Sequence, residues 1–221
     1  HQNTKPFMLD TFQNKWGFNQ EKLAKATENI ENPEIIQNKD EFYKKLSEIA
    51  PESADEHNQP GSIIQLEQQI EDDLEKMKVE VVDPMDAGKF PEMQDFFRQN
   101  PDPKIHEVFA ELHKQYPEKI PAGLDFYTKF LKLAESDPDK AKTILPAPSG
   151  KWILYFCPGT SVIDSDRHAV APNVNWNEDS FNRNRNDLRN SWNDNYRVVF
   201  LDILFFNLFI IVRRFFILPA I

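Results

Sequence analysis

The sequence is poor in the residues that build the commonest cofactor sites. Its single cysteine, Cys157, excludes a disulfide within the chain and any Cys-rich zinc or iron–sulfur site that this chain would supply alone. Its six glycines are well separated, and no Gly-rich phosphate-binding loop occurs. No G-x-S-x-G, H-E-x-x-H or EF-hand pattern is present either. The sequence therefore predicts no catalytic residue, no cofactor site and no metal site.

Positive charge is also scarce. The formal net charge is −10, and residues 1–150 hold 18 Lys and Arg against 29 Asp and Glu, whereas residues 151–221 hold 8 against 7. Nucleic-acid affinity comes largely from Lys and Arg side chains that displace counterions. The acidic first two thirds therefore argue against a nucleic-acid partner, and with no catalytic motif we expect no small-molecule substrate.

Two histidines and two glutamates share one predicted helix without forming a metal site. His106 and His113 stand seven residues apart, about 10 Å along a helix, which is too far for both to bind one ion. Glu107 and Glu111 have the spacing of a carboxylate pair, but no histidine lies at the right offset. We expect all four side chains on the solvated surface.

Residues 150–164, "GKWILYFCPGTSVID", form an apolar run that is rich in aromatic and branched residues and predicts a strand or an extended packed segment. Because no clear partner strand is present, an extended arm that crosses a neighbour is an equal alternative. The run resembles the strand before the active cysteine of peroxiredoxins and thioredoxin-like enzymes. Peroxiredoxins, however, place the cysteine after the proline, whereas Cys157 precedes Pro158, and the thioredoxin C-x-x-C is absent. Because an ordinary thiol is largely protonated at neutral pH, a packed, unreactive Cys157 is the preferred interpretation.

Apolar periodicity and proline punctuation predict a mainly α fold. Helices are expected near residues 40–50, 91–99, 103–116, 121–134 and 137–144, each with a polar cap or a proline at its start. We expect an extended arm with a short helix over residues 1–38 and an acidic all-α domain over residues 39–148.

Residues 62–81 carry the strongest periodic pattern outside the C-terminus. Apolar residues recur with heptad-like spacings of three and four, and about two and a half heptads are present. This length is short for an independent coiled coil, so the pattern predicts a helix whose seam packs on a partner helix of the same fold or of another subunit. The seam consists of Ile63, Leu66, Ile70, Leu74 and Met77.

Residues 149–196 are expected to be an extended segment rich in Asn and aromatic residues. Beyond the predicted strand, Phe181, Leu188, Trp192 and Tyr196 have spacings that fit one helical stripe. A loop with anchoring aromatic side chains is the alternative.

Residues 197–221 are predicted to form a hydrophobic helix. The run from Val198 to Val212 spans roughly 22 Å as a helix, less than the ~30 Å of bilayer hydrocarbon, but residues 198–221 together are long enough to cross. A helix buried in the domain core and an amphipathic helix in the membrane plane are the alternatives.

The polar residues of this predicted helix lie on one side. At about 100° per residue, Asp202, Asn207, Arg213 and Arg214 occupy less than half of the helical wheel and are expected to face other subunits. Trp192 and Tyr196 come just before the helix, where interfacial aromatic residues are common. The expected partners are therefore the lipid bilayer and other subunits of a membrane protein complex.

These patterns together favour a non-catalytic structural accessory subunit of a membrane complex. In general build the chain is similar to the supernumerary subunits of mitochondrial respiratory or ATP synthase complexes, which implies the mitochondrial inner membrane. Two alternatives remain: a soluble thiol or redox enzyme that uses Cys157, and a tail-anchored helical adaptor that recruits partners through residues 62–81.

Overall fold

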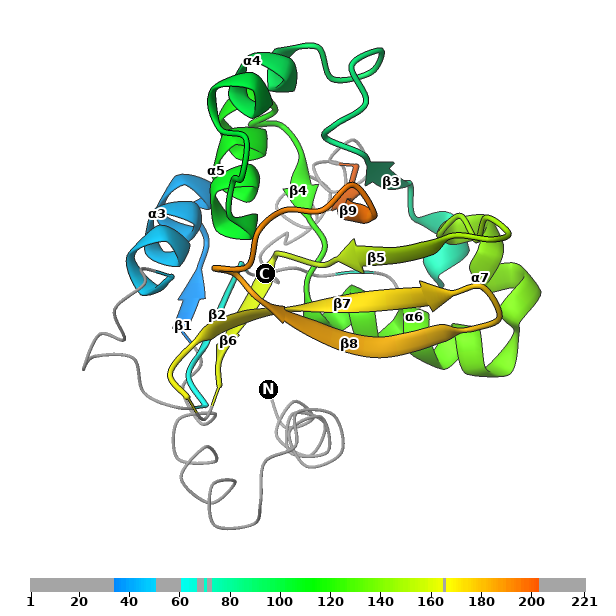
Figure 1. Cartoon of the computed structure of the whole chain (residues 1–221). Coiled ribbons are helices and arrows are strands. Elements are labelled where there is room, and N and C mark those ends of the chain that lie inside the picture. The colour runs from blue at the N-terminus through cyan, green and yellow to red at the C-terminus, as the bar shows by residue number, and fades with distance from the viewer. Residues whose placement is uncertain (1–33, 51–60, 67–69, 71–72, 165, 203–221) are drawn as a thin grey trace, which may run out of the picture.

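The fold is a mixed α/β arrangement rather than the predicted mainly α one. The structure, a computed structural model, describes residues 34–50, 61–66, 70, 73–164 and 166–202, and these form a curled sheet with helices on both faces (Figure 1). The strands are β1 (Glu34–Ile36), β2 (Ile63–Leu66), β3 (Val79–Val82), β4 (Ile120–Pro121), β5 (Trp152–Phe156), β6 (Thr160–Ile163), β7 (Ala169–Asn177), β8 (Phe181–Asp187) and β9 (Tyr196–Leu201).

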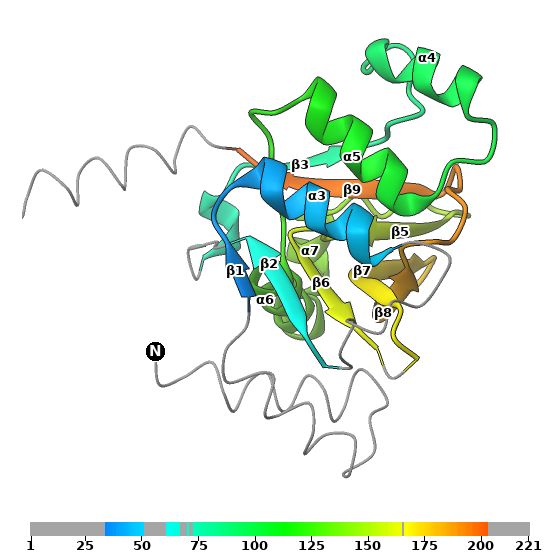
Figure 2. The ribbon, with the colours of Figure 1, turned by 90° about the vertical axis from the view of Figure 1, so that its left-hand side faces the viewer.

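The helices form two layers. One layer contains α3 (Lys39–Ile49), α4 (Glu92–Gln99) and α5 (Ile105–Gln115), and the other contains α6 (Leu124–Ser136) and α7 (Pro138–Ile144), with the short 3-10 helix η1 (Leu74–Lys76) beside α6. Figure 2 shows α3 and α5 in front of the sheet and α6 behind it. Strands from residues 39–148 and from residues 149–196, which were expected to form a helical domain and an extended segment, join one sheet.

The sheet is built around one interrupted strand. β5 and β6 both pair antiparallel with β7, and Cys157, Pro158 and Gly159 bulge between them. On its other edge β5 pairs with β9, whereas β6 pairs with β2, so the sheet forks at the bulge and its order is β1-β2-β6-β7-β5-β9-β3. The apolar run of residues 150–164 forms two strands, β5 and β6, whose partners β2, β7 and β9 belong to the same chain, so the interpretation as a strand is confirmed and the arm that crosses a neighbour is wrong.

Five helices expected from the sequence are confirmed, with small changes at their starts. α5 buries an i, i+3, i+4, i+7 stripe of apolar residues that are at most 1% exposed, namely Ile105, Val108, Phe109 and Leu112. α7 has the predicted Asp137 cap followed by Pro138. α3 is capped by Asn38 instead of Asp40, and Pro121 lies in β4 instead of opening α6.

The helix predicted over residues 62–81 is wrong. Ile63 and Leu66 lie in β2, Leu74 lies in η1, and residues 79–82 form β3. Ile64, which had no place in the heptad seam, is 3% exposed, because a strand flanked by neighbours on both faces buries consecutive residues. Pairing of β2 with β6 therefore overrides the heptad spacing.

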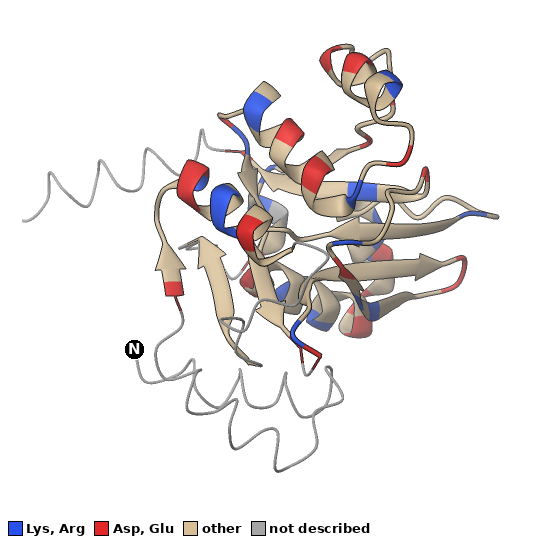
Figure 3. Cartoon of the chain, turned by 60° about the vertical axis from the view of Figure 1, so that its left-hand side comes forward, with Lys and Arg blue, Asp and Glu red and all other residues tan. Residues whose placement is uncertain are grey.

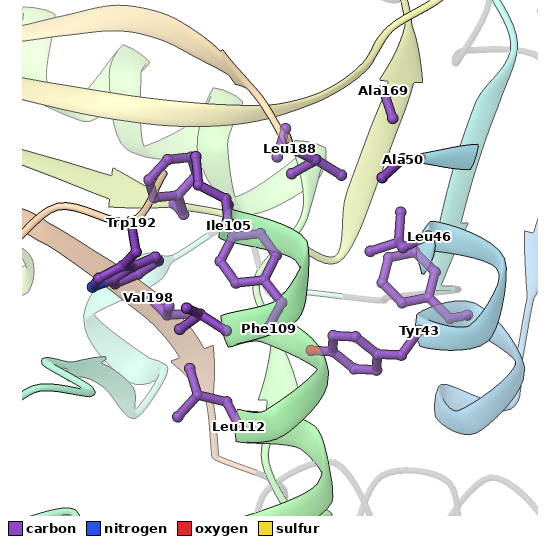
Figure 4. Packing of buried hydrophobic residues seen from close by; sticks show 14 of the residues in the cluster. Tyr43, Leu46, Ala50, Ile105, Phe109, Leu112, Ala169, Leu188, Trp192 and Val198 are labelled. Atoms are coloured by element: carbon purple, nitrogen blue, oxygen red, sulfur yellow. The ribbon is translucent and has the colours of Figure 1, made fainter. Parts of the chain in front are cut away.

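The sheet face toward α3 and α5 carries an aromatic core. Figure 4 shows Phe109 of α5 directed toward Trp192 and Val198, with Tyr43 and Leu46 of α3 on the other side of the helix. The Phe109 and Trp192 rings lie 6.3 Å apart between centroids, and Phe156 of β5 is 5.6 Å from Phe109. The second core fills the space between the opposite face and helices α6 and α7.

Candidate functional site

The first residues of the predicted C-terminal helix form a sheet strand. Val198, Val199, Phe200 and Leu201 lie in β9 and are at most 2% exposed, because β9 is paired on both edges and covered on both faces. The helix prediction is therefore wrong for these residues. Asp202 pairs with Lys78 next to β3, and the hydrogen bond that Lys78 donates to this carboxylate raises the pKa of Lys78.

Trp192 and Tyr196 are core residues in this structure. Trp192 is 9% exposed, and its ring lies 5.5 Å from that of Tyr196 and 6.2 Å from that of Phe156. Asn207, Arg213 and Arg214 lie outside the described residues, so their predicted membrane or subunit contacts stay predictions. Within the residues that the structure describes, no helix combines the length and the apolar character that a membrane crossing requires.

The residues of the predicted partner seam pack inside the chain. Ile63, Leu66 and Leu74 are at most 5% exposed, and Ile70 and Met77 pack as half-buried residues against the core under α6. These residues lie in different elements: Ile63 and Leu66 belong to β2, which pairs with β6, whereas Leu74 belongs to η1. The residues therefore form no continuous stripe that a partner helix would recognise.

Cys157 is sealed in the bulge between β5 and β6. Its side chain is 0% exposed, its backbone N–H donates to the carbonyl of Pro172 at 2.9 Å, and burial raises the pKa of the thiol far above its usual value. A nucleophilic cysteine needs the thiolate and access to a reactant. The geometry provides neither, which argues against a thiol enzyme that uses this residue.

A polar groove of about 730 Å³ opens at the start of α5. It is lined by the α4–α5 connection, by His106 and Glu107, and by Asp187, Arg189 and Asn190 after β8. His106 Nδ1 lies 2.9 Å from the carbonyl oxygen of Leu188, which fixes the ring. Of the histidines expected on the surface, His106 is half-buried, and His113 is 10% exposed and stacked on Tyr43.

The charged groups of this groove pair with one another. Arg189 donates to the carboxylate of Asp187 from its backbone N–H, from Nε, which lies 3.0 Å from Oδ1 and 3.2 Å from Oδ2, and from Nη2 to Oδ2 at 2.6 Å. His168 Nδ1 lies 3.1 Å from Oδ2. Burial alone raises the pKa of Asp187, but the hydrogen bonds of Arg189 and the nearby positive charges outweigh burial and lower it. The groove is thus an ion-pair network, and a ligand would have to compete with it.

A different surface, on the β5–β7–β8 part of the sheet, carries a set of amides. Residues directly opposed in an antiparallel pair share a face. Asn173 opposes Asn184, Asn175 opposes Asn182, and Asn186 stands opposite Ala171 on the face that belongs to the α3–α5 side. We call these five asparagines, together with Trp152 and Tyr196 beside them, the asparagine face.

The amides of the asparagine face are incompletely satisfied. Asn173 is 0% exposed, and neither Nδ2 nor Oδ1 has a hydrogen-bond partner; Oδ1 of Asn175 and Nε1 of Trp192 are buried without a partner as well. Asn186 Nδ2 donates to the hydroxyl of Tyr196 at 3.3 Å. Because an unpaired buried polar group costs about 1–3 kcal/mol, four such atoms close together are unusual in a core.

The aromatic side of this face is partly open. Trp152 is 39% exposed and lies 6.5 Å from the Tyr196 ring, which in turn contacts Phe156 at 5.2 Å. Asn182 is exposed, and Asn175, Asn184, Asn186 and Tyr196 are half-buried. A ligand can therefore reach one aromatic ring and several amides at the same time.

Sequence reasoning missed the asparagine face although a pattern marks it. The stretch "NVNWNEDSFNRNRND" places Asn at alternate positions before and after the residues Glu178 to Ser180. Alternation with period two predicts strands, and two such runs around a short polar link predict a hairpin. The prediction followed the aromatic spacing of 181–196 instead, and the helical stripe it proposed is wrong because residues 181–187 form β8.

Comparison with known proteins gives no family assignment. No family model matches the chain, and no match was found among curated proteins or among solved structures. Among the described residues, no three His, Cys, Asp or Glu side chains are grouped so that they would hold a metal ion. Function is therefore argued from the geometry of this chain alone.

Proposed function

We propose that the chain is a non-catalytic accessory subunit of a membrane assembly, in which the α/β domain stands outside the bilayer and residues 203–221 contact lipid or neighbouring subunits. The mitochondrial inner membrane, which the sequence analysis favoured, is part of this proposal. The main support for this proposal is that an apolar segment, residues 203–221, follows a domain whose described surface has no apolar patch that could cover the segment.

The apolar segment follows β9 directly. Of the nineteen residues 203–221, only Asn207, Arg213 and Arg214 are polar, and fourteen are Ile, Leu, Phe or Val. At about 1.5 kcal/mol or more for each such side chain, exposure of all fourteen to water costs on the order of 20 kcal/mol. This exceeds the roughly 5–15 kcal/mol that stabilises a typical domain, so the segment requires shelter.

The described surface provides little of that shelter. The large hydrophobic residues exposed on it are Ile35 of β1, Met85 after β3 and Trp152 of β5, which come from three separate elements. Acidic and basic residues recur along the helices (Figure 3). Because α3–α7 and the sheet complete two cores among themselves, the case for partners rests on the apolar segment and not on a deficient core.

The two alternative functions lose support in this structure. A thiol enzyme needs an accessible thiolate, but Cys157 is fully buried and its pKa is raised. A tail-anchored adaptor needs an exposed seam, but Ile63, Leu66 and Leu74 are buried within the chain.

Membrane extraction with a matched pair of variants tests the proposal. The full-length chain is expected to stay with membranes in alkaline carbonate and to float with liposomes. Ile210→Lys should reduce the membrane fraction, because a Lys near the centre of a span costs about 2.5–3.5 kcal/mol, whereas Ile210→Leu should not. Release of the unmodified chain by carbonate, or equal behaviour of the two variants, would refute membrane embedding.

A second measurement tests the accessory role. After solubilisation in a mild detergent, the chain is expected to migrate in a large assembly on a native gel and to co-purify with fixed partners. Migration as a free monomer from every detergent that keeps the domain folded would contradict the subunit proposal while leaving membrane attachment intact.

A further inference from the structure

We propose that the asparagine face binds a neutral carbohydrate, with sugar hydroxyls on the Asn amides and the apolar side of a sugar ring on Trp152. This inference concerns the folded domain and is independent of the membrane attachment proposed above. It rests on four observations: the arrangement of the amides, their unsatisfied atoms, the exposed indole, and the absence of charge on the face.

The amides form a regular array. Asn175 and Asn182 oppose each other across β7 and β8, and Asn173 and Asn184 form the next pair on the same face. Such an array repeats at about 5 Å across the strands and about 7 Å along them. Each Asn offers two N–H donors and one acceptor oxygen side by side, which matches pairs of neighbouring hydroxyls that both donate and accept.

Several of these amides are already oriented. The Nδ2 group of Asn182 donates to the carbonyl oxygen of Ser180 at 3.3 Å and to its hydroxyl at 3.2 Å, and Nδ2 of Asn186 donates to Tyr196. These N–H groups are engaged within the chain and hold the two side chains in place, which lowers the ordering cost of binding, and a sugar hydroxyl would donate to their Oδ1 atoms. Oδ1 of Asn175 is buried without a partner, and Asn173, two residues along β7 on the same face, is 0% exposed with both amide atoms unpaired. Packing does not explain these buried atoms, and the amides that a sugar can reach are those of the exposed Asn182 and the half-buried Asn184 and Asn186.

The aromatic component lies beside the amides. Trp152 begins β5, opposite Asn177, and is one of the three large hydrophobic residues exposed on the described surface. An indole ring carries negative potential on its faces, which attracts the partly positive C–H groups on one side of a pyranose. The ring of Tyr196, 6.5 Å from Trp152, supports it from the β9 side. A ligand site commonly combines such an apolar platform with a few placed polar groups.

The charge pattern selects a neutral ligand. The residues that share this face on β5, β7 and β8 are Trp, Leu, Phe, Ala and Asn, whereas Arg183, Arg185 and Asp187 of β8 alternate to the other side. A phosphate or sulfate group would find no cation on the face to pair with. This uncharged surface differs from the groove at α5, where charged side chains form ion pairs.

Figure 1 shows how the fold leaves the face available. β7 and β8 extend as a long hairpin, with α6 and α7 behind it, and the helices α3, α4 and α5 lie toward the other end of the sheet. α6 contacts β7 and β8 from the side opposite the asparagines, through residues such as Glu135, which pairs with Arg183 at 2.7 Å. The helical layers therefore cover one side of the hairpin and leave the amide side to Trp192, Tyr196 and a ligand.

Binding is tested on the full-length chain in micelles of a detergent without a sugar head group. The probes are cellohexaose, maltohexaose, mannohexaose, xylohexaose and chitohexaose, and the readouts are isothermal calorimetry and tryptophan fluorescence. At least one hexaose should bind saturably at micromolar to millimolar concentration. Trp152→Ala should weaken that binding by about tenfold, and Trp152→Phe, which keeps an aromatic ring, by about threefold or less.

The exposed amide provides a second variant that the fold tolerates. Asn182→Ala removes an exposed side chain and should weaken binding by about fivefold through lost hydrogen bonds. Ile35→Ala, at an exposed apolar residue of β1, is the matched control and should bind like the unmodified chain. Circular dichroism confirms that each variant is folded.

Three outcomes would overturn the proposal. In the first, the folded chain binds none of the five hexaoses saturably. In the second, Trp152→Ala and Asn182→Ala leave hexaose binding unchanged. In the third, the chain binds extended peptides along the β8 edge and does not bind sugars. None of these outcomes alters the membrane-extraction result, so the two proposals fail separately.

Discussion

The burial of Cys157 makes the stability of the domain depend on pH in the alkaline range. In the folded chain the thiol is 0% exposed and its pKa is raised by burial, whereas in the unfolded chain it titrates near 8.5. Above that pH the unfolded state releases a proton that the folded state keeps. The unfolded state is then stabilised, so the free energy of unfolding falls as pH rises.

The magnitude follows from one proton. Each pH unit above the unfolded pKa lowers the free energy of unfolding by about 1.4 kcal/mol, so between neutrality and pH 10 the loss from this thiol is about 2 kcal/mol. Buried tyrosines such as Tyr43 and Tyr127, whose pKa values are also raised, contribute at higher pH because unfolded tyrosine titrates near 10. Unfolded tyrosine is half titrated at about pH 10, so the buried tyrosines already contribute there, but their contribution is the same in Cys157→Ala and cancels in the comparison with that variant.

The assay compares the unmodified chain with Cys157→Ala in urea, with tryptophan fluorescence as the signal and the same micelle solution for both. Cys157→Ala lowers the free energy of unfolding at every pH because it removes a buried sulfur. The variant also lacks the additional decrease of this free energy that the thiol causes as pH rises above about 8.5. The difference in free energy of unfolding should therefore shift by about 2 kcal/mol in favour of the variant between pH 7 and pH 10. Parallel pH profiles, or rapid labelling of Cys157 in the folded chain, would refute the argument.

Two further predictions concern buried polar groups. Asp187→Asn removes the ion pair with Arg189 and should cost about 1.5 kcal/mol at neutral pH. Because the pKa of Asp187 is lowered in the folded chain, the unmodified chain loses this contribution as pH falls below about 4. The free energies of unfolding of the two proteins, measured in urea, should therefore converge in acid. A difference that stays constant with pH would contradict the ion pair. Asn173→Leu replaces two unpartnered buried polar atoms with apolar ones of similar volume and should raise the free energy of unfolding by about 1–3 kcal/mol. A decrease would show that the Asn173 amide is satisfied in the folded protein.

Local patterns predicted the helices of this fold well. The stripe through Ile105, Val108, Phe109 and Leu112 and the Asp137–Pro138 start are encoded within one or two turns, so neighbours in sequence suffice to identify α5 and α7. For the same reason the run Trp152–Ile163, interpreted as a strand or as an extended arm, could be recognised as extended, and it forms β5 and β6. Its partners could not be found in this way, because a ladder joins residues that are far apart in the chain.

The errors occurred where tertiary pairing competes with a helical period. Ile63 and Leu66 have helical spacing, yet the ladder between β2 and β6 and burial on both faces decide their conformation. Val198–Leu201 were grouped with the apolar residues that follow them, although a four-residue apolar run fits a buried strand equally well. The alternation of asparagines such as Asn173, Asn175 and Asn182 would have predicted the asparagine face. That prediction requires reading the periodicity of polar residues in the way that the periodicity of apolar residues is usually read.

The two sides of β7 show why the asparagine face calls for a function. Val174 and Trp176 point into the core beneath α6, where apolar side chains are stabilised by burial. Asn173 points to the opposite side of the same strand, is equally buried, and leaves its amide unpaired. An apolar residue there would fold at lower cost, so packing gives no reason for the amide. The neighbouring amides of Asn182, Asn184 and Asn186 are exposed or half-buried and can meet a ligand, and the sugar-binding experiment asks whether that ligand exists.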